Sequence, residues 1–209
     1  MGTYDTPVRD RRAAATRAAI LEALGELVAA SGIAELSVQQ VADRAGVSHR
    51  TVYRHFPDRT ALLDALGVWV QQRLGDDVDE TAVDRADDLV EMIAPVFAGL
   101  DLLTPASEAM ARISVAEGAR SAEHLARTAR MRDALMPALE ERVDDPDAVF
   151  AILRHLLSAL TWWVARDEFG LDGDRAGQAV ATIVDAVLHP PAADQPSAPG
   201  TGGQGFRRL

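Results

Sequence analysis

The chain has 209 residues, 48% hydrophobic and 25% charged, which is the composition of a folded globular protein and excludes wholesale disorder. It contains no cysteine, which excludes disulfide bonds, thiolate metal sites and a cysteine nucleophile. No run of 18 apolar residues and no apolar N-terminal signal segment occurs, so the sequence predicts a cytoplasmic protein with no membrane partner.

The charge is distributed unevenly along the chain. All 21 basic residues are arginine, and with 32 acidic residues the formal net charge is −11. Residues 1–59 contain 8 arginines and 7 acidic residues, whereas residues 60–209 contain 13 and 25. An acidic protein is not expected to bind nucleic acid indiscriminately, but the N-terminal part can still carry a local DNA-binding surface.

The hydrophobic pattern predicts an all-α protein of about nine helices. After a flexible start at residues 1–9, apolar residues at helical spacing define the predicted helices in chain order: residues 10–31, 38–45, 49–56, 59–74, 86–100, 105–117, 122–142, 146–168 and 174–188. No segment has the alternating, β-branched pattern of a half-buried strand. Pro95 and Pro137 fall within predicted helices and predict kinks or breaks there. Residues 190–209 are rich in Pro, Gly, Ala and Ser and predict a disordered tail.

Capping residues fix many of these boundaries. Gly32 and Gly46 follow helices and are suited to a left-handed C-terminal turn. Five helix starts carry a residue whose side chain can accept from the first free backbone amides: Ser37, Ser48, Asp58, Thr104 and Asp145. The last two are each followed by a proline, which is favoured in the first helical turn.

Residues 38–56 have the spacing of a helix-turn-helix unit. Two helices of about two turns flank Gly46, which can adopt the positive φ of a tight turn. Ala42 is small enough for the second helix to cross the first closely, and Val52 fills the angle between them. Ser37 and Gln40 form a capping box that opens the first helix.

The exposed face of the second helix is basic and carries no carboxylate. Arg50 and Arg54 lie one turn apart and point away from Val52, and Thr51 and Tyr53 flank them. Arginine can pair with guanine edges in the major groove of DNA, and hydroxyl groups can donate to phosphates or bases. The alternative is an ordinary solvated amphipathic helix that happens to carry two arginines.

The segment from Leu36 to Leu63, LSVQQVADRAGVSHRTVYRHFPDRTALL, resembles the DNA-binding head of TetR (tetracycline-repressor) family regulators. Tyr53 with the Phe56-Pro57 ending distinguishes this family from other helix-turn-helix families. Arg59 stands where such proteins usually have a lysine that contacts phosphate. The residues expected to bind DNA are Ser37, Gln39, Ser48, His49, Arg50, Thr51, Tyr53, Arg54, His55 and Arg59.

The resemblance implies a helix-turn-helix domain at residues 10–58 and a helical ligand-binding and dimerisation domain at residues 59–189. A second, weaker resemblance covers residues 161–171 and the helix that follows them, which in the family form the interface of a homodimer. The residues expected in that interface are Leu153, Leu156, Leu157, Leu160, Trp163, Val164, Val180, Ile183, Val184 and Val187. The alternative is one larger monomer core.

The family resemblance also implies a small-molecule cavity among the middle helices. The candidate lining residues are Met92, Phe97, Met110, Ile113, His124, Met131, Phe150, His155 and Trp162. Apolar cavities of this kind usually combine bulky side chains with a few polar groups. For each of these residues taken alone, plain core packing is the alternative.

The sequence predicts no catalytic residue, no metal site and no cofactor. Residues 200–205 match the dinucleotide fingerprint formally, but no strand precedes them and no helix follows. The five histidines include no pair at i, i+4 spacing. The expected function is a repressor that a small-molecule inducer releases from a palindromic operator. The alternatives are a helical binder or enzyme that only retains the head, and a regulator without a small-molecule inducer.

Overall fold

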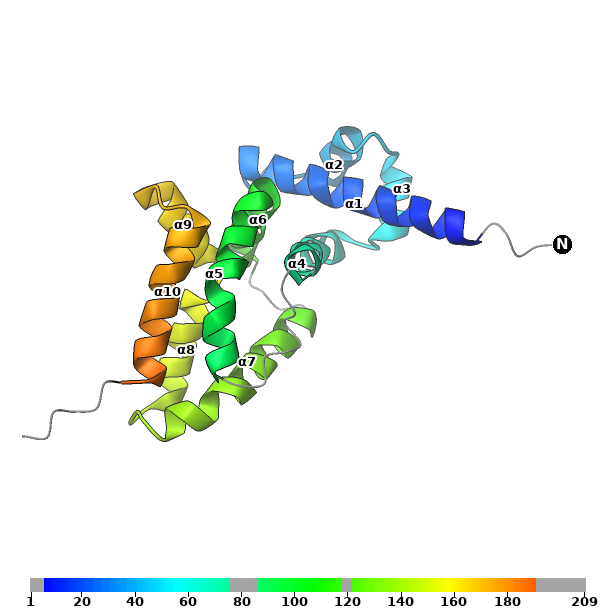
Figure 1. Cartoon of the computed structure of the whole chain (residues 1–209). Coiled ribbons are helices and arrows are strands. Elements are labelled where there is room, and N and C mark those ends of the chain that lie inside the picture. The colour runs from blue at the N-terminus through cyan, green and yellow to red at the C-terminus, as the bar shows by residue number, and fades with distance from the viewer. Residues whose placement is uncertain (1–5, 76–85, 118–121, 191–209) are drawn as a thin grey trace, which may run out of the picture.

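The computed structural model describes residues 6–75, 86–117 and 122–190, and within these segments it contains ten helices and no strand (Figure 1). In chain order the helices are α1 (Thr6–Ser31), α2 (Val38–Arg44), α3 (His49–His55), α4 (Arg59–Gly75), α5 (Ala86–Leu102), α6 (Thr104–Ala116), α7 (Ala122–Glu140), α8 (Pro146–Leu156), α9 (Ala159–Phe169) and α10 (Gly173–Leu188). The all-α prediction is confirmed.

The N-terminal domain is built on local capping signals. The Ser37 hydroxyl accepts from the Gln40 amide at 3.2 Å, and the Gln40 side chain accepts from the Ser37 amide at 2.8 Å, which completes the predicted capping box. Gly46 has a φ of +66°, so the turn between α2 and α3 uses the left-handed conformation that glycine adopts at little cost. Val52 is buried between the two helices, as the spacing predicts.

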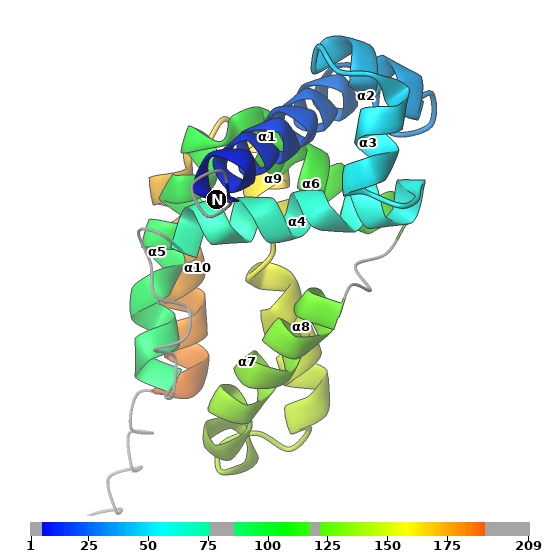
Figure 2. The ribbon, with the colours of Figure 1, turned by 90° about the vertical axis from the view of Figure 1, so that its right-hand side faces the viewer.

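Two helix pairs of the C-terminal part lie below the N-terminal helices. Figure 2 shows α4 running across the middle of the molecule below α1, with α5 and α10 packed together below it on one side and α7 and α8 on the other. α6 packs against α1 and is the main body helix in contact with the N-terminal domain. This arrangement leaves α4 and α6 between α1–α3 and the remaining helices.

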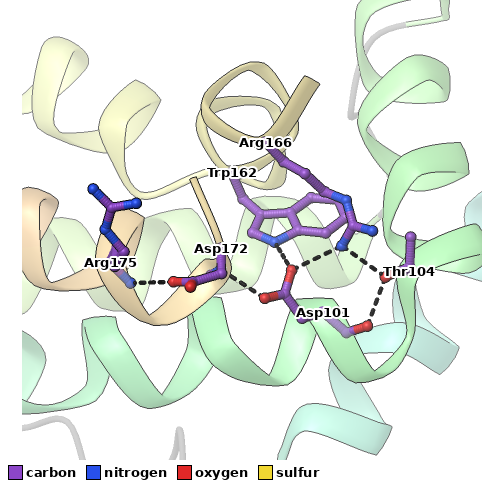
Figure 3. A network of polar contacts seen from close by, with 7 residues as sticks. Asp101, Thr104, Trp162, Arg166, Asp172 and Arg175 are labelled. Atoms are coloured by element: carbon purple, nitrogen blue, oxygen red, sulfur yellow. Dashed lines mark hydrogen bonds and ion pairs between the residues drawn. The ribbon is translucent and has the colours of Figure 1, made fainter. Parts of the chain in front are cut away.

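A hydrogen-bond network around Asp101 joins α5, α9 and α10 (Figure 3). The Asp101 carboxylate accepts from the indole Nε1 of Trp162 at 2.9 Å, from Arg166 at 3.0 Å and from the Gly173 amide at 2.6 Å. Trp162 is fully buried, so its N–H needs this partner. The network fixes the start of α10 against the end of α5.

Four expectations about helix boundaries need correction. The predicted helix at residues 146–168 is two helices that meet at 56°, because Ser158 caps α9 by accepting from the Thr161 amide. Thr104 is the first residue of α6 rather than its cap, and its hydroxyl donates to the Asp101 carbonyl at 2.6 Å. Pro95 and Pro137 lie inside α5 and α7 and do not break these helices, whereas the kinks predicted as the alternative stay a prediction.

The first helix begins earlier than the sequence predicts. α1 begins at Thr6, inside the segment predicted to be flexible, and a proline in its first turn is compatible with a helix start. The predicted disordered tail, apart from Pro190, lies outside the described residues. So does the glycine-rich match at residues 200–205.

Within the described segments, no single helix is long and apolar enough to cross a membrane. The pairs α5–α6 and α8–α9 reach the required length and apolarity only when taken together, across bends of 108° and 56°.

We predict that Gly25→Ala destabilises the protein, although Gly→Ala inside a helix usually stabilises by about 1 kcal/mol. A Cβ at Gly25 would lie 2.9 Å from the Ala106 Cα, so α1 and α6 would have to separate. Overpacking of this kind costs about 1–3 kcal/mol. The measurement is the free energy of unfolding in urea.

The matched control is Gly67→Ala, inside α4, where a Cβ would meet only the Met110 sulfur at 4.0 Å. This variant is expected to be as stable as the wild type or slightly more stable. Equal stability of the two variants would contradict the close approach of α1 and α6.

Candidate functional site

The outer face of α3 is exposed and basic. Ser48, His49, Arg50, Tyr53 and Arg54 are all exposed, and Tyr53 keeps 42% of its surface open to solvent. The His49 and Tyr53 rings meet edge to face at 4.7 Å, which orders them on the helix surface. Ser48 caps the helix by accepting from the Thr51 amide at 3.1 Å.

The two arginines of α3 differ from several other arginines of the chain. Among the described residues, neither Arg50 nor Arg54 forms an ion pair. Several other guanidinium groups are neutralised within the chain, as in Arg44 with Glu26 at 2.7 Å. Others pair in the same way: Arg73, Arg112, Arg132, Arg142 and Arg166. The positive charge of α3 is therefore available to an anionic partner such as the DNA backbone.

Other residues predicted to bind DNA form hydrogen bonds within the chain or are partly buried. The Gln39 side chain donates to Asp43 at 2.7 Å, and Ser37 is engaged in its capping box. Thr51 is half-buried and shares a hydrogen bond with the Ser48 hydroxyl at 2.8 Å. The His55 ring is partly buried, and burial, with the charges of Arg54 and Arg17, lowers its pKa.

Arg59 links the DNA-binding domain to the body. One of its guanidinium nitrogens lies 2.8 Å from a Glu117 carboxylate oxygen, and the other donates to the Ile33 carbonyl at 3.4 Å. Both side chains of the ion pair are partly exposed. The residue predicted to contact phosphate is thus held, in the free chain, by an acid at the end of α6.

A cavity of about 190 Å³ lies among α4, α5, α6, α7 and α8. Its walls on α4, α5 and α6 are mostly apolar. Of the nine residues predicted to line a cavity, the structure places six there: Met92, Phe97, Met110, Ile113, His124 and Met131.

Three of the predicted lining residues lie elsewhere. Trp162 is fully buried and bonded to Asp101, and Phe150 packs in the core. His155 is exposed on α8, and its carbonyl accepts from the Ser158 hydroxyl at 2.6 Å.

The opposite wall of the cavity is cationic, and sequence reasoning missed this feature. Arg127 and Arg130 of α7 and Arg154 of α8 all line it, together with His124. Arg154 donates to the Thr128 hydroxyl at 3.2 Å and lies 3.3 Å from the His124 Nε2 atom. The available signal was an arginine inside the otherwise apolar stripe of α8, beside Phe150 and Leu153.

The residues predicted for the dimer interface divide into two groups. Leu153, Val180 and Val184 are buried within the chain itself. Ile183 is 49% exposed on α10, and the others are half-buried: Leu156, Leu157, Leu160, Trp163, Val164 and Val187. Ile152 of α8, which was not among the predicted residues, is 64% exposed.

Within the described part of the chain, no group of three or more His, Asp or Glu side chains could hold a metal ion.

Comparisons with known proteins agree with this geometry. The family model of bacterial regulatory proteins, tetR family, matches residues 20–66. A TetR family transcription regulator from Marinobacter aquaeolei VT8 has the same fold, with a TM-score of 0.65 at 20% identity over 85% of this chain and 98% of that chain. A putative TetR-family transcriptional regulator from Rhodococcus sp. gives 0.61 at 23% identity, covering 83% and 98%.

A gamma-butyrolactone receptor (ArpA-like protein) also matches, with a TM-score of 0.50 at 22% identity over 83% of this chain and 97% of that chain. No curated protein matches the sequence.

The helix-turn-helix unit and its free basic face define a helical protein with a DNA-binding head. The resemblance to the TetR family is confirmed: the head matches the family model, and the chain as a whole has the fold of TetR-family transcription regulators.

We predict that His124 makes the protein less stable at mildly acidic pH. Burial, with the charges of Arg154 and Arg127, lowers the pKa of His124 to about 4, from 6.5. Between these values the unfolded chain binds a proton that the folded chain does not, so the free energy of unfolding falls as the pH falls from 6.5 towards 4.

Urea unfolding of wild type and His124→Gln at pH values across this range tests the prediction. The variant is expected to lose less stability on acidification, and the slope that remains comes in part from His55. The control is His155→Gln, which changes an exposed histidine outside the cavity. An unchanged slope in His124→Gln would show that the cavity does not disfavour the charged imidazole.

Proposed function

We propose that the protein is a cytoplasmic, homodimeric, sequence-specific DNA-binding regulator that represses transcription until a small molecule enters the cavity. The observation that carries the proposal is the acid-free face of α3, whose two arginines have no ion-pair partner among the described residues. A helix with this face fits the major groove, where arginine pairs with guanine O6 and N7.

A homodimer supplies the second recognition helix. Two heads related by a two-fold axis read half-sites about 34–36 Å apart, so the operator is palindromic. Exposed apolar side chains on α8 and α10, Ile152 and Ile183, support a partner subunit on these helices.

Two helices connect the cavity with the DNA-binding domain. α6 lines the cavity through Ile113 and Ser114, contacts α1 at the Gly25–Ala106 approach, and ends beside Glu117. α4 lines the cavity through Leu63 and begins at Arg59, the partner of Glu117. A ligand that favours a different position of α6 or α4 therefore also changes the orientation of the head.

In the proposed mechanism the ligand shifts a population rather than blocking DNA directly. The cavity lies on the far side of α4 and α6 from α3, so a bound molecule does not touch the operator. It lowers DNA affinity by binding better to a form in which the two heads are misaligned. Coupling of about 1–3 kcal/mol is usual for such linkage.

Selection of duplexes from a randomised pool, followed by titration of the selected DNA, tests the function. We expect a palindromic consensus and an affinity that falls by about 10³–10⁵-fold between 50 and 200 mM salt, which is the response of 6–10 phosphate contacts. Arg50→Ala is expected to cost about 1–3 kcal/mol and to relax specificity at one base step.

The matched control is Arg175→Ala, which removes an exposed arginine at the start of α10. Binding that is insensitive to salt and no tighter than to random DNA would favour a helical binder or enzyme that only retains the head. A uniform loss across all sequences in Arg50→Ala would contradict its base-reading role.

We also predict that Glu117→Gln strengthens DNA binding. Arg59 must leave Glu117 to contact a phosphate, and a partly exposed ion pair contributes about 0.2–1 kcal/mol. Releasing Arg59 should therefore raise the affinity by up to about fivefold, at every sequence alike. The measurement is fluorescence anisotropy with the selected operator.

Glu168→Gln makes the same change of charge at an exposed site near the end of α9 and serves as the control. An equal gain in both variants would mean that net charge alone, and not the Arg59–Glu117 pair, limits binding.

A further inference from the structure

The two walls of the cavity differ in chemistry. α4, α5 and α6 contribute aliphatic, aromatic and thioether side chains, of which Ile93, Phe97 and Ile113 are buried in the core. α7 and α8 contribute Arg127, Arg130 and Arg154. A ligand that fills this space meets an apolar surface on one side and guanidinium groups on the other.

Arg154 is the informative group of the cationic wall. Its neighbours along α8 are apolar: Phe150 one turn before it and Leu153 beside it are buried, and Leu157 after it is half-buried. Its guanidinium donates to the neutral Thr128 hydroxyl at 3.2 Å. Among the described residues no carboxylate pairs with it, whereas Arg132 of α7, close to this wall in the sequence, pairs with Asp147.

The other neighbours of Arg154 do not neutralise it. Burial and the positive charge of Arg127 lower the pKa of Arg154 to about 10, which shows that the surroundings disfavour its charge. Asp64 of α4 is the one acid among the described residues that line the cavity, and it forms no ion pair with any of the described residues. The cavity therefore presents a partly desolvated cation that lacks a counter-charge.

We propose that the cavity takes an organic anion with an apolar body, whose charged group pairs with Arg154 and whose body lies against α4, α5 and α6. The inference names the chemical class of the inducer and rests on the proposed function. An anion restores the missing counter-charge and forms charge-assisted hydrogen bonds, for which the planar guanidinium is suited.

The same geometry sets the specificity of the site. An amine is repelled by the Arg154 guanidinium. A neutral molecule of the same shape fills the apolar part but leaves the Arg154 charge uncompensated. A small anion such as acetate reaches the guanidinium and gains nothing from the apolar wall. Charge and apolar body are both required.

The test compares decanoate with decanamide, which has the same chain without the charge. Calorimetric titration of the full-length protein is expected to show decanoate binding about ten- to hundredfold more tightly, the range for a hydrogen bond to a charged group. Acetate is expected to show no measurable binding.

Arg154→Gln should reduce the affinity for decanoate by a similar factor while leaving that for decanamide unchanged. Arg175→Gln, which removes an exposed arginine outside the cavity, should change neither. Because Arg154→Gln could also loosen the α7–α8 pair, its melting temperature is measured without ligand. A melting temperature close to the wild-type value assigns the loss of binding to the charge.

Equal affinity for decanoate and decanamide, or an equal loss of both in Arg154→Gln, would overturn the inference, as would the absence of binding by either probe. None of these outcomes affects selection of a palindromic operator by the head. Failure to select any DNA would instead refute the proposed function. Release of the selected operator by decanoate but not by decanamide would support both.

Discussion

The close approach of α1 and α6 is the constraint on which the arrangement of the two domains depends. A side chain at Gly25 would collide with the Ala106 backbone, so the two helices are in direct contact there. Arg112 of α6 also donates to the Val28 carbonyl of α1 at 3.3 Å. Because α6 lines the cavity as well, it connects this space directly with α1. A change in the position of α6 would therefore couple the cavity to the N-terminal helices.

The sequence predicts most of the fold because its helix ends are encoded locally. Ser37, Gln40 and Gly46 each act within four residues of their own position, and each does what its type and spacing indicate. The errors arise where the residue pattern conceals the local signal. Ser158 interrupts an apolar stripe that continues on both sides of it, and Thr104 turns to the Asp101 carbonyl within a network that includes Arg166.

The candidate sites were predictable to different degrees for the same reason. The free face of α3 follows from the positions of Arg50 and Arg54 on one short helix. The cationic wall of the cavity does not, because Arg154 and Thr128 are 26 residues apart and an arginine on an amphipathic helix is usually solvated. Phe150 and Trp162 do not line the cavity: Phe150 packs in the core, and the Trp162 indole is fully buried and donates to Asp101.

The bend at residues 157–158 is both part of the cavity wall and the junction between α8 and α9. Leu157 and Ser158 line the cavity, and they are also the joint at which α8 and α9 diverge by 56°. α8 carries the exposed Ile152, which in the proposed dimer faces the partner subunit. In the proposed dimer, a ligand that changes the angle between α8 and α9 would also move Ile152 relative to the partner subunit. In a dimer of this kind, binding in one pocket would therefore change the subunit boundary that the second pocket shares.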